Sequence, residues 1–184
     1  MNKLSSQDRS QLIRLASSLP VGSVERKAIL AGLKSSLEKN IPGKHILGDA
    51  KVSGYAVVYQ NAEVIGSAHV SDSSQVSGHA QVGGYSQVYD IAKVFGYAQV
   101  FGNAKVFGSS QVFGDAQVDD KAFVFGYAQV YGMAKVYGRA HVSGIAMISG
   151  NARIGGTAEI LGGNWDGSEG EILSGRWRGP GIPA

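Results

Sequence analysis

The chain holds four histidines, which are its main candidates for acid-base chemistry because imidazole changes its charge near neutral pH. His69 and His141 stand at equivalent positions of a six-residue repeat, and His79 stands at a different position of the same unit. A single histidine that faces solvent is far more often a surface residue than a general base. We therefore assign no catalytic residue and keep His79 and His141 as the weak candidates for such a role.

Asp72 and Asp90 form the second chemically interesting set. They lie eighteen residues apart, and two carboxylates stacked at one corner of a coiled chain could attract a cation. Both also stand where the repeat otherwise has glycine, which accounts for them without a ligand, and no calcium-loop spacing surrounds them. The 184 residues include no cysteine, which excludes a disulfide framework and a thiolate metal site. We expect neither a metal nor a cofactor.

An uninterrupted six-residue repeat from Gly48 to Gly162 must position these residues. Its form is G-x-A-x-V-x, with an aliphatic residue at every sixth position from Val52 to Ile160. Alanine stands two residues before each aliphatic residue, with three exceptions: Ser74, Ser86 and Ser110. An α-helix cannot hold a period of six on one face, whereas residues two apart share one face of a strand. The alanines and valines therefore point inward together.

Glycine stands two residues after nearly every aliphatic position, where a corner of the chain needs a backbone conformation closed to most side chains. Its replacements are Gln60, Asp72, Asp90 and Asp120. Aspartate is one of the few residues that tolerate a left-handed backbone. The repeat thus alternates face and corner, and three faces close one triangular coil of eighteen residues. This predicts an all-β solenoid, a parallel β-helix of about six coils over residues 44–162.

The pattern resembles the hexapeptide-repeat family of left-handed parallel β-helices, and in particular the uninterrupted hexapeptide proteins labelled as transferases. The resemblance covers Gly48 to Gly162 and implies a left-handed coil. It also implies one enzymatic alternative, an acyltransferase with an acetyl-coenzyme-A-type donor and His79 or His141 as general base. Members with that activity have a loop that interrupts the coils and covers the donor, and no such insertion interrupts this repeat.

Aromatic residues follow the aliphatic position in the middle of the repeat. Residues eighteen apart should stack on one face, which predicts three columns: Tyr89, Phe107 and Phe125; Phe95, Phe113 and Tyr131; and Phe101, Asp119 and Tyr137. Stacked rings would stabilise neighbouring coils. An exposed belt of this extent would also be typical of a protein contact surface. The two roles are compatible on different faces of the rod.

The segments on either side of the repeat have other patterns. Residues 1–41 predict a helical hairpin, because apolar residues fall at helical spacing on both sides of a break at Pro20. We expect the hairpin to cap the first coil or to dock to a partner. Residues 163–184 carry Trp165 and Trp177 in two G-x-W-x-G units. We expect this segment to plug the last coil as a cap or to anchor to a neighbouring molecule as a tail.

Charge and hydropathy bear on the partners and the cellular location of the protein. The net charge of +3 comes from scattered basic residues, which gives no support for nucleic-acid binding. The chain has no apolar run long enough to span a membrane, and its N-terminus lacks the apolar core of a signal peptide. We expect a cytoplasmic protein or part of a particle that assembles inside the cell.

These patterns favour a structural or assembly module over an enzyme. We predict a rigid rod that forms a homo-oligomer, either a trimer or a filament, or that docks to a protein partner. The contacts would come from the aromatic positions and from the two terminal segments. A further alternative is a virion or envelope component, in which the rod would act as a spacer.

Overall fold

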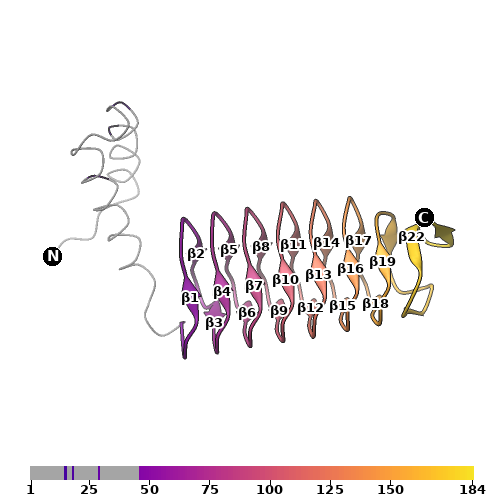
Figure 1. Cartoon of the computed structure of the whole chain (residues 1–184), viewed down its shortest axis with the longest axis horizontal. Coiled ribbons are helices and arrows are strands. Elements are labelled where there is room, and N and C mark those ends of the chain that lie inside the picture. The colour runs from indigo at the N-terminus through magenta and orange to yellow at the C-terminus, as the bar shows by residue number, and fades with distance from the viewer. Residues whose placement is uncertain (1–14, 16–17, 19–28, 30–45) are drawn as a thin grey trace. The chain divides into compact units, whose positions relative to one another are not determined.

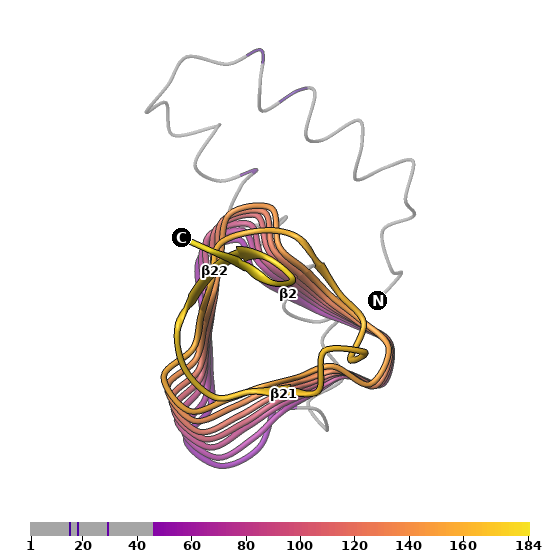
Figure 2. The same cartoon turned by 90° about the vertical axis from the view of Figure 1, so that its right-hand side faces the viewer.

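The structure, a computed structural model, describes residues 15, 18, 29 and 46–184. From residue 46 onwards the chain winds as a solenoid of stacked coils (Figure 1). Seen along the rod, the coils superimpose as a triangle with one sheet on each side (Figure 2). The prediction of an all-β parallel solenoid is therefore confirmed. The left-handed winding stays a prediction from the family resemblance.

Each sheet takes every third strand of the chain. Sheet I has the order β1 (Lys51–Val52), β4 (His69–Val70), β7 (Gln87–Val88), β10 (Lys105–Val106), β13 (Phe123–Val124), β16 (His141–Val142), β19 (Glu159–Ile160), β22 (Arg176–Gly179) and β23 (Ile182–Pro183). Sheet II has the order β2 (Val57–Val58), β5 (Gln75–Val76), β8 (Lys93–Val94), β11 (Gln111–Val112), β14 (Gln129–Val130), β17 (Met147–Ile148) and β20 (Asn164–Trp165). Sheet III has the order β3 (Glu63–Val64), β6 (Gln81–Val82), β9 (Gln99–Val100), β12 (Gln117–Val118), β15 (Lys135–Val136), β18 (Arg153–Ile154) and β21 (Glu171–Ile172).

The strands pair in parallel and in register, so that equivalent residues of successive coils lie side by side. Val106 of β10, for example, is the partner of Val88 in β7 and of Val124 in β13. Within the repeat, partners are eighteen residues apart, as the repeat predicts. Each outward side chain therefore belongs to a column that runs along the rod.

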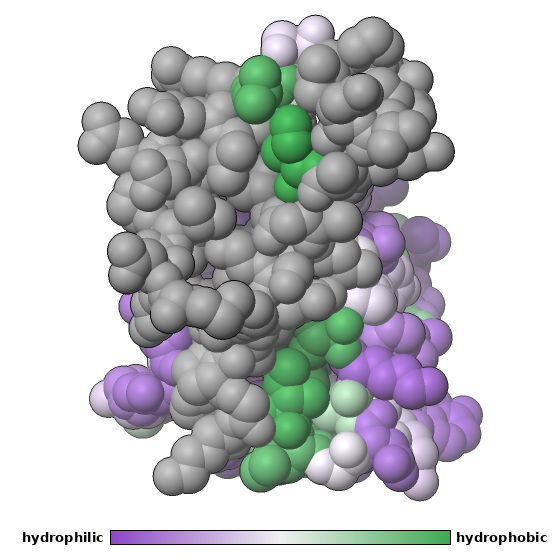
Figure 3. Space-filling model, turned by 90° about the vertical axis from the view of Figure 1, so that its left-hand side faces the viewer, coloured by the Kyte–Doolittle hydropathy of each residue, from purple (hydrophilic) through white to green (hydrophobic). Residues whose placement is uncertain are grey.

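The core is a stack of alanine and valine or isoleucine side chains, and most of them are fully buried. Three serines replace alanine in this stack and stay buried because their hydroxyls find carbonyl partners. The Ser74 hydroxyl lies 2.7 Å from the carbonyl oxygen of Ser71, and the Ser110 hydroxyl lies 2.8 Å from that of Phe107. At the first coil, by contrast, Val52 is only partly buried, and apolar surface is visible at that end of the rod (Figure 3).

The corners have the predicted left-handed backbone. Gly102 and Gly126 have φ angles of 64° and 70°, and the four replacements have φ angles of 58–63°. A replacement side chain has a second use, because its oxygen accepts a hydrogen bond from the backbone N–H of the equivalent corner in the following coil. The Gly108 N–H donates to Asp90 Oδ2 at 2.9 Å, and the Gly138 N–H donates to Asp120 Oδ2 at 3.0 Å. The corner carboxylates thus have a structural role.

The C-terminal segment continues the solenoid after the repeat ends. Its strands β20, β21 and β22 pair with β17, β18 and β19, which adds a further coil and brings the total to about seven. Trp165 lies beside Ile148 and Trp177 lies beside Ile160. Each tryptophan thus stands in the last coil where the preceding coil has its aliphatic residue. The chain then turns back, and β23 pairs antiparallel with β22. This hairpin covers the edge of sheet I.

The predicted helical hairpin over residues 1–41 falls almost wholly outside the described residues and stays a prediction. In the part of the chain that the structure describes, no helix has both the length and the apolar character needed to cross a membrane.

Candidate functional site

Two aromatic columns stack as the repeat predicts. On the sheet I side, the rings of Tyr89, Phe107 and Phe125 have centroids 4.9 and 5.0 Å apart and are almost parallel. On the sheet II side, Phe95, Phe113 and Tyr131 stack in the same way. All six rings are partly buried, and this burial, followed by the charge of Asp90, raises the pKa of the Tyr89 phenol. The columns therefore stabilise the stacking of the central coils.

The third predicted column does not form a ring stack. Phe101 lies over Gly83 of the preceding coil, where an added Cβ would meet its ring carbons at 2.5 Å. Tyr137 lies over Gly155 of the following coil, in the opposite direction. Asp119 stands between the two rings, and a hollow of about 250 Å³ opens beside it. The two rings point in opposite directions because the glycine that leaves room for Phe101 is in the preceding coil, whereas the one that leaves room for Tyr137 is in the following coil.

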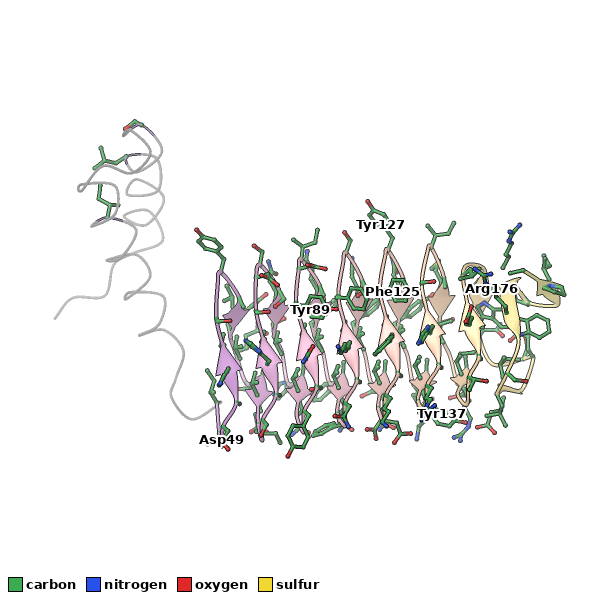
Figure 4. All side chains as sticks on the ribbon, viewed as in Figure 1. Asp49, Tyr89, Phe125, Tyr127, Tyr137 and Arg176 are labelled. Atoms are coloured by element: carbon green, nitrogen blue, oxygen red, sulfur yellow. The ribbon has the colours of Figure 1, made fainter. Side chains whose placement is uncertain are left out.

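Tyr137, labelled in Figure 4, contacts two charged residues of the two following coils, Arg153 and Glu171. Its hydroxyl donates a hydrogen bond to Glu171, and Arg153 Nε lies 2.8 Å from the same carboxylate oxygen. The guanidinium also lies 5.5 Å from the centre of the Tyr137 ring. The bonds from Tyr137 and then Arg153 lower the pKa of the Glu171 carboxyl, while burial and the Glu171 contact raise the pKa of Tyr137. This clasp ties β15, β18 and β21 together.

The two tryptophans belong to the interior of the terminal coil. Trp165 is only 1% exposed, and its ring N–H donates to the Gly162 carbonyl at 2.9 Å. Trp177 is half-buried and meets Trp165 edge to face, with ring centres 6.3 Å apart. Whether residues 163–184 act as a cap or as a tail stays a prediction. The Trp165 ring does not form part of an exposed contact surface, contrary to its place among the predicted interaction residues.

His79 and His141 lie on different parts of the triangle and have different neighbours. His79 lies at the corner that leads into sheet III, where its Nε2 is 2.9 Å from the Asn61 amide nitrogen and its ring stacks on Tyr97. His141 lies on sheet I and stacks on Phe123. Within the described residues no hydrogen bond joins either imidazole to a carboxylate, and no group of three metal-ligating side chains forms. A catalytic role for His79 or His141 therefore stays a prediction.

Half of the exposed large apolar side chains in the described residues gather on one side of the rod, in a surface that the sequence analysis missed. They lie on sheet II and on the corner that leads into it, and we call this set the sheet II surface: Tyr55, Val57, Tyr59, Ile91, Tyr127, Ile145 and Met147. Tyr127 is 70% exposed and points away from the rod, whereas Phe125 two residues earlier lies along it (Figure 4). Exposed apolar surface of this extent is typical of a protein contact.

A signal for this surface was present in the spacing. Tyr55, Ile91, Tyr127 and Ile145 all follow a corner residue, and they are separated by multiples of eighteen. The residue after the corner is the one that points outward most freely. The residue after valine, which carried the aromatic prediction, instead packs against its own column.

Comparison with models of known protein families, with curated proteins and with solved structures finds no match to this chain.

Proposed function

We propose that the chain is a structural module, a rigid rod that associates with further copies of itself through the sheet II surface. The single observation that carries this proposal is that seven exposed apolar side chains share one side of the triangle, more than on either other side. The surface runs from β2 to β17, six strands of sheet II, and is therefore about 24 Å long at the usual strand spacing. Burying it against another rod would remove apolar area from water, which drives most protein association.

The direction of this surface favours side-by-side contact over end-to-end growth. The exposed residues line the length of the rod, and at the C-terminal end β23 covers the edge of sheet I. End-to-end contact would need free strand edges. We infer a closed homo-oligomer, and a rod of this kind would also serve as a spacer within a larger particle.

The acyltransferase alternative has less support. The strands of the repeat follow one another without an inserted loop, and His79 Nε2 already has an amide partner. The hexapeptide family resemblance therefore contributes the fold expectation to this proposal and no activity.

The test is the mass of the protein in solution, measured by light scattering on the whole chain. We expect a discrete oligomer for the natural sequence and a monomer for the double variant Tyr127→Asp and Ile145→Asp, because two carboxylates would need to be desolvated in the contact. Tyr85→Asp is the matched control, since Tyr85 is 68% exposed after an equivalent corner but lies beside sheet I.

Three results would count against the proposal. The first is a natural protein that stays monomeric at high concentration. The second is an oligomer that survives the double variant, and the third is an equal loss of mass with Tyr85→Asp. Large, heterogeneous particles would favour end-to-end growth over the sheet II surface.

A further inference from the structure

A second surface, on sheet III, has a different chemistry. A hollow of about 570 Å³ runs along the rod over four coils, between two columns of side chains. One column stands at the corner that leads into sheet III, and the other consists of the outward residues of β3, β6, β9 and β12. The lining residues are Asn61, His79, Tyr97 and Asp115 in the first column, and Glu63, Gln81, Gln99 and Gln117 in the second. We call this hollow the sheet III groove.

Contacts along the columns hold several of these side chains in place. His79 and Tyr97 stack with ring centres 4.8 Å apart, and His79 is also bonded to Asn61. In the second column the Gln81 amide donates to Glu63 at 3.1 Å. Each neighbour contact occupies only part of a side chain's capacity, because a glutamine amide offers two donor hydrogens and an acceptor oxygen. The groove thus presents preorganised donors and acceptors at the spacing of the coils, which lowers the entropy lost on binding.

The shape and charge of the sheet III groove select among possible ligands. Glu63 and Asp115 place two carboxylates in the lining, which disfavours nucleic acids and other polyanions. A peptide that binds by strand addition needs a free sheet edge. Strands β6, β9 and β12 of the groove are each paired on both sides, so the floor consists of side chains. These two observations favour a neutral chain that offers a donor and an acceptor at every unit and that needs no sheet edge to bind.

The aromatic side chains add an amphipathic wall. Tyr97 is 61% exposed and presents ring carbon and a hydroxyl to the groove beside the amides of the second column. Ligand sites for neutral polar molecules combine apolar area with a few fixed polar groups in this manner. We propose that the sheet III groove binds an extended, neutral oligosaccharide with β-1,4 linkages, whose hydroxyls meet the glutamine and asparagine amides. The straight course of the groove along the rod fits an extended glycan and not a coiled one.

The experiment is a titration of the whole protein with cellohexaose, followed by backbone and side-chain amide NMR signals. We expect shifts that are confined to the groove residues, and at least tenfold weaker binding for the variant Tyr97→Ala. Tyr127→Ala is the matched control: both tyrosines precede the same Ala-Gln-Val sequence after a corner glycine, but Tyr127 lies on the sheet II surface. The control should bind cellohexaose as the natural protein does.

Four outcomes would overturn the inference. They are no binding of cellohexaose at millimolar concentration, equal binding by Tyr97→Ala, equal or tighter binding of the coiled α-linked maltohexaose, and tighter binding of an anionic galacturonate hexamer or an extended neutral peptide. Because Tyr97→Ala leaves the sheet II surface intact and Tyr127→Ala leaves the groove intact, failure here is distinguishable from failure of the self-association proposal.

Discussion

Asp90 offers a sharp test of why this chain has glycine at its corners. The residue has a φ angle of 59°, and its Oδ2 accepts the backbone N–H of Gly108 at 2.9 Å. Replacing it with alanine would remove the hydrogen bond and leave a Cβ in a left-handed conformation. Replacing it with glycine would remove the same bond but relieve the backbone. The two variants therefore separate the contribution of the bond from that of the backbone.

The magnitudes follow from these two contributions. An exposed hydrogen bond contributes about 1 kcal/mol to the free energy of unfolding. A left-handed conformation costs a residue with a Cβ about 1–2 kcal/mol, and glycine loses about 0.5–1 kcal/mol more backbone entropy on folding. Because Asp90 already bears the left-handed cost, we expect Asp90→Ala to lower the free energy of unfolding by about 1 kcal/mol, the value of the lost hydrogen bond. Asp90→Gly should change it by less than about 0.5 kcal/mol, because the relieved backbone offsets the lost bond and the added entropy cost. Glycine should thus be the better replacement.

The assay is urea denaturation followed by circular dichroism, with hydrogen exchange at the Gly108 amide as a local measurement. Both variants should lose protection at Gly108, because both lack the carboxylate that accepts its N–H. Asp115 is the control position, since it is exposed and does not have a positive φ angle. There alanine should be at least as stable as glycine. If Asp90→Ala equals or exceeds Asp90→Gly in stability, left-handed strain is not the reason for glycine at the corners.

Three further predictions concern the last coils. Gly155→Ala should lower the denaturation midpoint and shift the NMR signals of the Tyr137 ring, because an added Cβ would clash with that ring. An unchanged midpoint would contradict this packing. Glu171 has a lowered pKa in the fold, so its stabilising contribution is present above its ordinary pKa near 4.5 and is lost as the pH falls through the folded value. Glu171→Gln should therefore be less stable than the natural protein at pH 7 and closer to it at pH 3, and parallel curves would refute the clasp. Trp165→Ala should destabilise the terminal coil by about 3–5 kcal/mol, measured by hydrogen exchange of its amides, because the ring is wholly buried; retained protection would be the contrary result.

Sequence reasoning succeeds here where one constraint is repeated many times. The inward alanines and valines, the left-handed corners and the eighteen-residue coil all follow from residue types that recur at fixed spacing. Two of the three aromatic columns follow from the same spacing. The third could not be predicted in this way, because the direction of each ring depends on a single neighbour. Gly83 draws Phe101 one way, and Gly155 draws Tyr137 the other.

The candidate sites were harder to predict from the repeat. The sheet II surface depends on how far a side chain projects at a corner, and the sheet III groove depends on contacts along a column, such as the stacking of His79 on Tyr97. The further coil was missed because the tryptophans fall one residue short of the repeat: Trp165 pairs with Ile148 and Trp177 with Ile160. The strands of the last coil pair with the preceding coil although their spacing departs from the repeat.

The in-register stacking of coils fixes which side of the triangle each residue faces, as well as the length of the rod. Duplication of one whole coil would lengthen the molecule by one strand spacing, about 4.8 Å, and leave each outward column on its own sheet. Insertion of a single hexapeptide would satisfy the same core and corners, yet it would carry every later residue to the next side of the triangle. Tyr127 and Ile145 would then part from Tyr55, and the sheet II surface would be divided between two faces. Variation in the length of such a gene is therefore free in steps of three repeats and disruptive in steps of one.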